Sequence, residues 1–142
     1  MKIIHNSKAQ TPHDDTLSLL YTTRSRPPLG HTPYLKIKNA VLGSSYELSV
    51  VFCGDHLSRR LNREYRHKDY PTDVLSFSLD TTTGELFINL RAVERTHTAY
   101  ERDRAEFIAF LFIHGLYHLK GYQHGSRMQA EEAETRRKFG LK

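Results

Sequence analysis

Apolar and polar residues alternate over residues 73–79 and again over residues 86–90. Because successive side chains of a strand point to opposite faces of a sheet, this period of two predicts two β-strands. The turn-rich segment 80–84 between them predicts a hairpin. Residues 46–53 are apolar at consecutive positions toward their end, which predicts a central strand buried on both faces.

Other segments repeat their apolar residues at the spacing of an amphipathic helix. The strongest runs from about residue 101 to 120 and is apolar on nearly every side over residues 107–113. We therefore expect a buried central helix on which the sheet packs. Asp55 is expected to cap another helix, which carries apolar residues on one face and arginines on the other. Shorter helices are predicted at 32–43 and 128–139.

The segment before residue 30 shows no such period. Residues 2–5 are apolar enough for a short edge strand, whereas residues 6–30 are polar and contain three prolines. We expect this stretch to be a loop with one helical turn near residues 15–20. Residues 91–99 are compatible with a helix, but nothing in them decides it. A chain of 142 residues is typical of one domain, so we expect a single domain over residues 1–142.

The composition is that of a soluble globular protein, with 38% hydrophobic and 26% charged residues. No apolar run approaches the length of a membrane span, and the sequence turns polar after His5, too soon for a signal peptide; the cytoplasm is the expected location. Cys53 is the only cysteine, which excludes an internal disulfide and a cysteine-based zinc finger. We expect it to be a small buried residue rather than a nucleophile. The net charge of +5 favours an anionic partner, most commonly nucleic acid.

Three histidines near the end of the central helix are spaced to hold one metal ion. His114 and His118 lie one turn apart on the same face of a helix. Gly121 can end that helix in a left-handed conformation, which lets His124 approach the same point from a loop. Three imidazoles leave one coordination position open, as catalytic zinc sites do. We therefore expect one divalent metal ion, zinc first, with nickel or copper also compatible with these ligands.

Two simpler interpretations compete with a metal site. The chain has nine histidines, so a pair at helical spacing can arise by chance, and a buried, hydrogen-bonded histidine is the commoner role. His124, in turn, is compatible with an exposed loop residue that binds nothing.

The residues around the histidines bear on the reaction. The spacing of the three histidines and Gly121 is that of the metzincin peptidases, but Gly115 stands where those enzymes carry the glutamate that acts as general base. Its absence argues against a peptidase. Metal-bound water can still attack a phosphodiester if a cation stabilises the developing charge, and the planar fork of arginine matches phosphate oxygens. The candidate is Arg66, at the end of the arginine-bearing helix.

The remaining cationic clusters are expected to be solvated. For Arg59, Arg60 and Arg63, a surface charge is favoured over a specific role. The run Arg-Arg-Lys at 136–138 predicts a solvated helix face, with nonspecific contact to RNA as the second interpretation.

The chain resembles the YbeY family of bacterial ribosomal RNA maturation factors over about residues 46–128. The resemblance rests on the run LNREYRHKDYPTDVLSF at 61–77, on Gly84-Glu85-Leu86 and on the histidine stretch 114–124. It implies a fold with both helices and strands, α/β in the broad sense and α+β in the strict one. A small mixed four-stranded sheet would pack on helices around a central buried helix. One departure stands out: the family usually has aspartate where this chain has Gln123, so a carboxylate that could orient a ligand histidine is missing.

The resemblance also implies a function. A member of this family is expected to be a metal-dependent, single-strand-specific endoribonuclease that acts in ribosomal RNA maturation and ribosome quality control. His114, His118 and His124 would be the metal ligands, Arg66 and His114 the catalytic residues, and ribosomal RNA or ribosomal particles the partners, with no membrane or DNA involved. An RNA-binding assembly factor with a structural metal is the alternative, and a metallopeptidase, disfavoured by Gly115, comes third.

Overall fold

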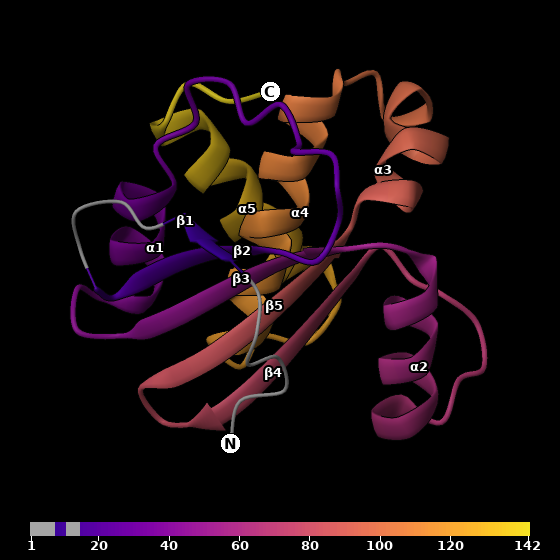
Figure 1. The fold of residues 1–142 in the computed structure, drawn as a ribbon. Helices are drawn as coiled ribbons and strands as arrows, with labels where there is room; N and C mark the ends of the chain where they lie inside the picture. The colour runs from indigo at the N-terminus through magenta and orange to yellow at the C-terminus, as the bar shows by residue number, and fades with distance from the viewer. Residues whose placement is uncertain (1–7, 11–14) are drawn as a thin grey trace.

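A computed structural model of the protein describes residues 8–10 and 15–142. Within this part of the chain, one mixed sheet is covered by helices on both faces (Figure 1). The elements are, in order, β1 (Lys8–Gln10), β2 (Leu17–Tyr21), α1 (Tyr34–Leu42), β3 (Glu47–Cys53), α2 (Asp55–Arg66), β4 (Val74–Asp80), β5 (Thr83–Asn89), α3 (Leu90–Thr96), the 3-10 helix η1 (His97–Tyr100), α4 (Arg104–Leu119) and α5 (Ser126–Lys138). The predicted α+β fold of one small domain is confirmed.

The sheet has the strand order β1-β2-β3-β5-β4. Strands β2, β3 and β5 run parallel, while β1 and β4 pair antiparallel at the two edges. The four strands β2 to β5 give the expected mixed sheet, and the three-residue β1 adds a fifth at one edge. The predicted hairpin is β4–β5, and the predicted central strand is β3, whose residues after Glu47 are all buried.

The prediction for the first part of the chain was wrong at residues 8–10 and 17–21, whereas residues 22–30 contain no helix or strand, as expected for a loop. Residues 17–21 form the strand β2, not a loop with a helical turn, and they pair in parallel with β3 from Leu17–Leu48 to Tyr21–Phe52. The edge of β3 supplies backbone partners that no local pattern reveals, because β3 lies far along the chain. Residues 2–5, which were expected to form an edge strand, lie outside the described residues.

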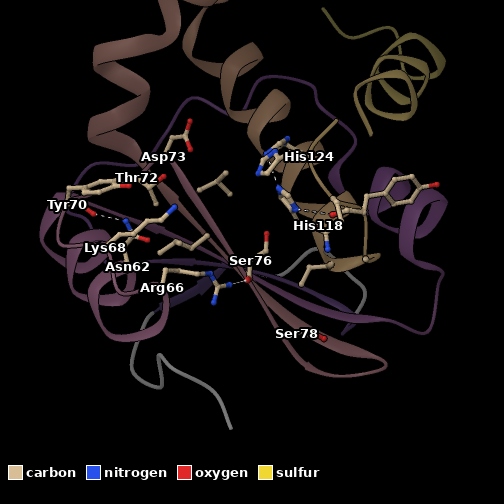
Figure 2. Close-up of a pocket in the computed structure, with 17 residues that line it drawn as sticks. Asn62, Arg66, Lys68, Tyr70, Thr72, Asp73, Ser76, Ser78, His118 and His124 are labelled. Atoms are coloured by element: carbon tan, nitrogen blue, oxygen red, sulfur yellow. Dashed lines mark hydrogen bonds between the residues drawn. The ribbon is translucent and has the colours of Figure 1, made fainter. Parts of the chain in front are cut away.

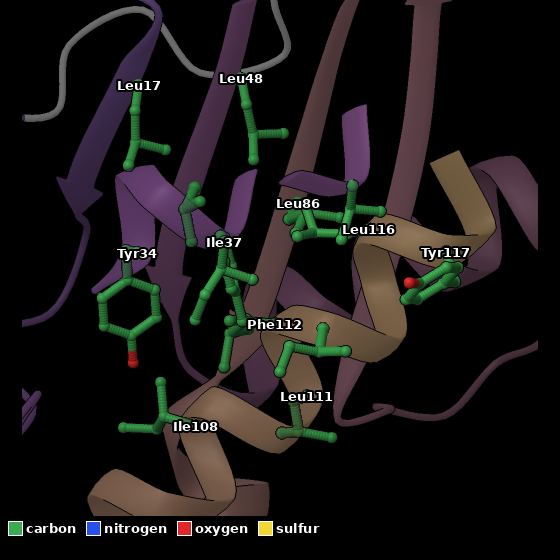
Figure 3. Close-up of a cluster of buried hydrophobic side chains, with 14 of the residues drawn as sticks. Leu17, Tyr34, Ile37, Leu48, Leu86, Ile108, Leu111, Phe112, Leu116 and Tyr117 are labelled. Atoms are coloured by element: carbon green, nitrogen blue, oxygen red, sulfur yellow. The ribbon is translucent and has the colours of Figure 1, made fainter. Parts of the chain in front are cut away.

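Helix α4 is the buried central helix that its sequence predicts. Its residues Phe107, Ile108, Phe112 and Leu116 have no exposed surface and pack with α1 and the sheet residues Leu17, Leu48 and Leu86 (Figure 3). Helix α2 covers the other face, where Leu61 packs with Val51, Cys53, Leu75, Phe77 and Phe87. This packing holds α4, and the histidines near its end, against the sheet.

Two local features differ from or refine the predictions. Asp55 does not cap α2, because Gly54 is the N-cap residue. Its carboxylate instead accepts hydrogen bonds from Arg95 and Asn89, which hold its pKa at about 2. Cys53 is fully buried, and burial raises the pKa of its thiol to about 12, as befits a packing residue rather than a nucleophile. Among the described residues, no helix has both the length and the apolarity to span a membrane.

Candidate metal centre

The three predicted histidines converge at the end of α4. The helix places His114 and His118 one turn apart, and Gly121, with φ +102°, turns the chain so that His124 returns to them. The ring centre of His124 lies 4.4 Å from that of His118 and 5.3 Å from that of His114. One nitrogen from each imidazole lies within 4.8 Å of the others. These residues could hold a metal ion, and the exposed His124 is not simply a distant loop residue.

Hydrogen bonds orient the two helical imidazoles. The Nδ1 atom of His114 lies 3.0 Å from a carboxylate oxygen of the buried Glu132, and Nδ1 of His118 lies 3.2 Å from the carbonyl oxygen of Tyr122. Both partners are acceptors, so each Nδ1 carries the proton and each Nε2 presents a lone pair. This is the arrangement in which metal-binding histidines are commonly held.

With both imidazoles neutral and in this tautomer, the two Nε2 atoms of His114 and His118 present lone pairs to each other at 3.2 Å. Two lone pairs at that distance repel unless a cation lies between them. Ligands of a tetrahedral zinc ion with bonds of about 2.0–2.1 Å stand about 3.3–3.4 Å apart, which agrees with the separation seen here. The donor set therefore fits a divalent metal ion.

The surroundings of His118 favour its uncharged form. Burial lowers the pKa of its imidazole below the usual value, and the neighbouring His114 and His124 lower it further. A neutral imidazole is the form that binds a metal.

Gly115 lies where α4 comes closest to the sheet. A Cβ atom at this position would lie 2.8 Å from Leu86 Cδ2 on β5 and 3.3 Å from Ser76 Oγ on β4. The backbone carbonyl of Gly115 also accepts a hydrogen bond from the Ser76 hydroxyl at 3.2 Å. The close packing of helix on sheet thus leaves no room for the glutamate that a metzincin peptidase needs here.

A cleft of about 640 Å³ runs from the histidines to the end of α2. Figure 2 shows Arg66 and Lys68 on one side of it and His118 and His124 on the other, with Ser76 of β4 between them. The guanidinium of Arg66 donates to the Ser76 carbonyl at 2.7 Å and lies 4.7 Å above the Phe77 ring. These contacts hold a positive charge at the wall of the cleft. Arg66 also donates to the Tyr65 carbonyl at 3.4 Å, and its remaining N–H groups have no hydrogen-bond partner within the described residues, so they are available to an anion.

The other arginines of α2 do not enter the cleft. Arg59 forms a two-bond ion pair with Asp69, and Arg63 lies 3.7 Å from the same carboxylate. All three side chains are more than half exposed, so these pairs contribute little stability, as expected for surface charges. The run 136–138 divides, however: Arg136 is half-buried against α4, while Arg137 is exposed and pairs with Glu134.

Two residues of the site were missed in the sequence. Glu132 lies on α5, and only the packing of α5 against α4 brings it to His114. Lys68 lines the cleft, and its place in the segment 61–77 next to Arg66 was the signal that could have identified it. Gln123 also lines the cleft but makes no hydrogen bond to a histidine within the described residues. Glu132 and Tyr122, rather than residue 123, therefore orient the two helical histidines.

Comparison with known proteins places this chain among its relatives. A family model described as Endoribonuclease YbeY matches residues 32–142. The chain is 36% identical over 117 residues to a protein named Endoribonuclease YbeY from Heliobacterium modesticaldum, covering 67% of this chain and 70% of that protein. It is 37% identical over 99 residues to the protein of that name from Aromatoleum aromaticum, covering 68% of this chain and 64% of the relative. The match thus spans about two thirds of the length of these relatives.

A solved structure shares the fold. The solution structure of TM1509 from Thermotoga maritima superimposes with a TM-score of 0.50 over 71% of this chain and 75% of that one, at 24% sequence identity. At this identity the likeness concerns the fold alone. The match of the family model over most of the chain is the stronger finding, and it shows that the chain belongs to the endoribonuclease YbeY family.

Proposed function

We propose that this protein is a metal-dependent endoribonuclease that cleaves single-stranded RNA in ribosomal RNA maturation and ribosome quality control. Membership of the YbeY family supports the endoribonuclease activity. The observation that carries the proposal is the three-imidazole cluster in the wall of a cleft that also contains Arg66 and Lys68. We expect the partners to be ribosomal RNA and ribosomal particles in the cytoplasm, rather than DNA or a membrane.

His114, His118 and His124 would hold the metal ion, with zinc as the first expectation and nickel as the alternative. Three nitrogen ligands leave a coordination position for a water molecule, and when bound, such a metal supplies a nucleophile at neutral pH by lowering the pKa of that water. Glu132 accepts a hydrogen bond from Nδ1 of His114, which would leave Nε2 of His114 as the atom that binds the ion. The protein provides no carboxylate at residue 115, so the reaction proposed is one on a phosphodiester.

Arg66 would hold the phosphate. Its bond to the Ser76 carbonyl fixes the guanidinium on β4, and its stacking on Phe77 limits its other motions. Lys68 adds a second positive charge in the same cleft. A phosphodiester between this pair and the histidines has its negative charge neutralised as it develops in the transition state.

Arg66→Ala is expected to slow cleavage of a single-stranded RNA by about 10²- to 10³-fold, the usual cost of removing one donor to a developing oxyanion. The measurement is single-turnover cleavage of a labelled oligoribonucleotide, with a chelator-treated sample to show which cleavage depends on metal. Arg60→Ala is the matched control, because Arg60 is exposed on the same helix and lines no part of the cleft. Equal rates for the two variants would contradict the role of Arg66.

A measurement of RNA binding by the same proteins, added to the cleavage assay, tests the second candidate function. If the unaltered protein binds RNA, loses that binding in Arg66→Ala and shows no chelator-sensitive cleavage, the protein is an RNA-binding assembly factor and the enzymatic proposal fails.

Glu132→Gln is expected to weaken zinc binding by about 10- to 100-fold, the usual effect of removing the charged partner of a ligand histidine. The amide still fits the space but no longer favours the Nδ1 proton of His114 by charge. The affinity can be measured by competition with a chromogenic chelator. Glu131→Gln changes the same charge at an exposed neighbouring position and should leave the affinity unaltered. An equal affinity for both variants would count against Glu132.

A further inference from the structure

A second pocket, of about 320 Å³, opens on the other side of the histidines, between α4 and α5. Three residues, Asp73, His114 and His124, line both this pocket and the larger cleft. The imidazole cluster thus lies on the boundary between two hollows rather than at the end of one. Both hollows fall in the size range of about 300–1,000 Å³ that is usual for ligand sites.

One wall of the second pocket is aromatic. Tyr100, at the end of η1, has 44% of its surface exposed, and its ring lies 5.6 Å from that of Phe110. Arg102 holds this wall in place: it donates to the backbone oxygen of Tyr100 at 3.2 Å, and its guanidinium lies 4.3 Å above the Phe110 ring. An exposed aromatic ring on a fixed support is a surface on which a nucleobase can stack.

The opposite wall carries Arg136 of α5. Its guanidinium lies 5.0 Å from the centre of the Phe110 ring, and within the described residues its side chain makes no hydrogen bond or ion pair. The carboxylate nearest in sequence on the same helix face, Glu132, is already engaged by His114. Burial lowers the pKa of Arg136, the positive charge of Arg102 lowers it further, and the carboxylate of Glu132 raises it only in part. A half-buried arginine beside an aromatic platform therefore has donors available for an anion or a carbonyl oxygen.

We infer that the second pocket binds the nucleotide adjoining the scissile phosphate of a single-stranded RNA, with its base against Tyr100 and with Arg136 donating to its phosphate or base oxygens. The strand then crosses the histidine cluster from the larger cleft into the second pocket. This assignment rests on the proposed RNA substrate and adds to it the place of one nucleotide. It requires an unpaired strand, because a base in a duplex cannot enter the pocket.

The first test is the affinity for a short fluorescein-labelled oligouridylate, measured by anisotropy. Arg136→Ala is expected to weaken binding about tenfold and Tyr100→Ala about fivefold or more, as loss of a charged contact and of base stacking do. Two matched controls should stay within about twofold of the unaltered protein: Arg137→Ala removes an exposed arginine next in the helix, and Tyr100→Phe keeps the ring. Equal weakening by Arg136→Ala and Arg137→Ala would overturn the assignment.

The second test uses the unaltered protein and so does not depend on any variant folding. Oligouridylates with one 4-thiouridine at successive positions are irradiated in the complex, and the crosslinked peptides are identified by mass spectrometry. A crosslink to the peptide containing Tyr100 or Phe110, from one position only, is expected. Crosslinks confined to the α2 side of the histidines would overturn the assignment.

The outcomes also separate this assignment from the proposed function. An RNA that crosslinks at Tyr100 but is never cleaved supports a nucleotide site in the second pocket and contradicts the enzymatic proposal, including the position of that nucleotide beside a scissile phosphate. If RNA is cleaved in the presence of metal, but its affinity is unchanged by Arg136→Ala and Tyr100→Ala, the subsite is contradicted and the enzymatic proposal stands. A protein that binds no RNA removes both.

Discussion

His114→Ala is expected to abolish metal binding and to lower RNA cleavage by more than about 100-fold. Removing a residue that only orients a ligand costs about 10- to 100-fold, and removing the ligand itself should cost more. His114 is also the residue that joins the cluster to Glu132, whose buried carboxylate would lose its 3.0 Å partner. The measurements are the metal content of the purified protein by elemental analysis and the single-turnover cleavage rate of a labelled single-stranded RNA.

His56→Ala is the control, because His56 is an exposed residue outside the cluster and the same side chain is removed. It should keep both metal and activity. A His114 variant that has lost its metal yet cuts RNA at the normal rate would show that the imidazole cluster is not part of the reaction. Circular dichroism of both variants separates loss of the site from loss of the fold.

Gly115→Glu is expected to lower the free energy of unfolding by about 3 kcal/mol or more. A Cβ atom alone would come within 2.8 Å of Leu86 Cδ2, and Leu86 has no exposed surface into which it could move. Overpacking of this kind costs about 1–3 kcal/mol, and an unpaired carboxylate held against the sheet adds to it. Urea denaturation measures the change, and no gain of peptidase activity is expected.

A double-mutant cycle with Leu86→Val tests the stated cause. Gly115→Ala should cost about 1 kcal/mol in the unaltered protein, since overpacking outweighs a gain in helix propensity of about 1 kcal/mol. In the Leu86→Val background, where the side chain is shorter, the same change should be neutral or stabilising. If Gly115→Ala is equally costly in both backgrounds, contact with Leu86 is not what requires glycine.

The sequence by itself determined the elements whose pattern is local. Alternation over two short segments predicted β4 and β5, and the nearly continuous apolar run predicted α4 as the buried helix. The spacing of His114 and His118 on that helix, with Gly121 beyond it, predicted the convergence of three imidazoles. These inferences hold because the geometry of one helix or one hairpin sets the directions of its own side chains.

Only the tertiary structure decided features that depend on contacts between distant segments. Strand β2 forms because the edge of β3 provides its hydrogen bonds. Asp55 accepts hydrogen bonds from Arg95 of α3 instead of capping its own helix, because α3 packs beside it. Glu132 orients a histidine eighteen positions away in the sequence, and the second pocket forms only where η1, α4 and α5 meet. No local period records such contacts, since each depends on how whole elements pack. For this protein, therefore, the sequence alone located the imidazole cluster. The packing of helices and sheet determined that Glu132 and Tyr122 orient two of the imidazoles and that Leu86 fills the space beside Gly115. It also formed the two pockets that flank the cluster.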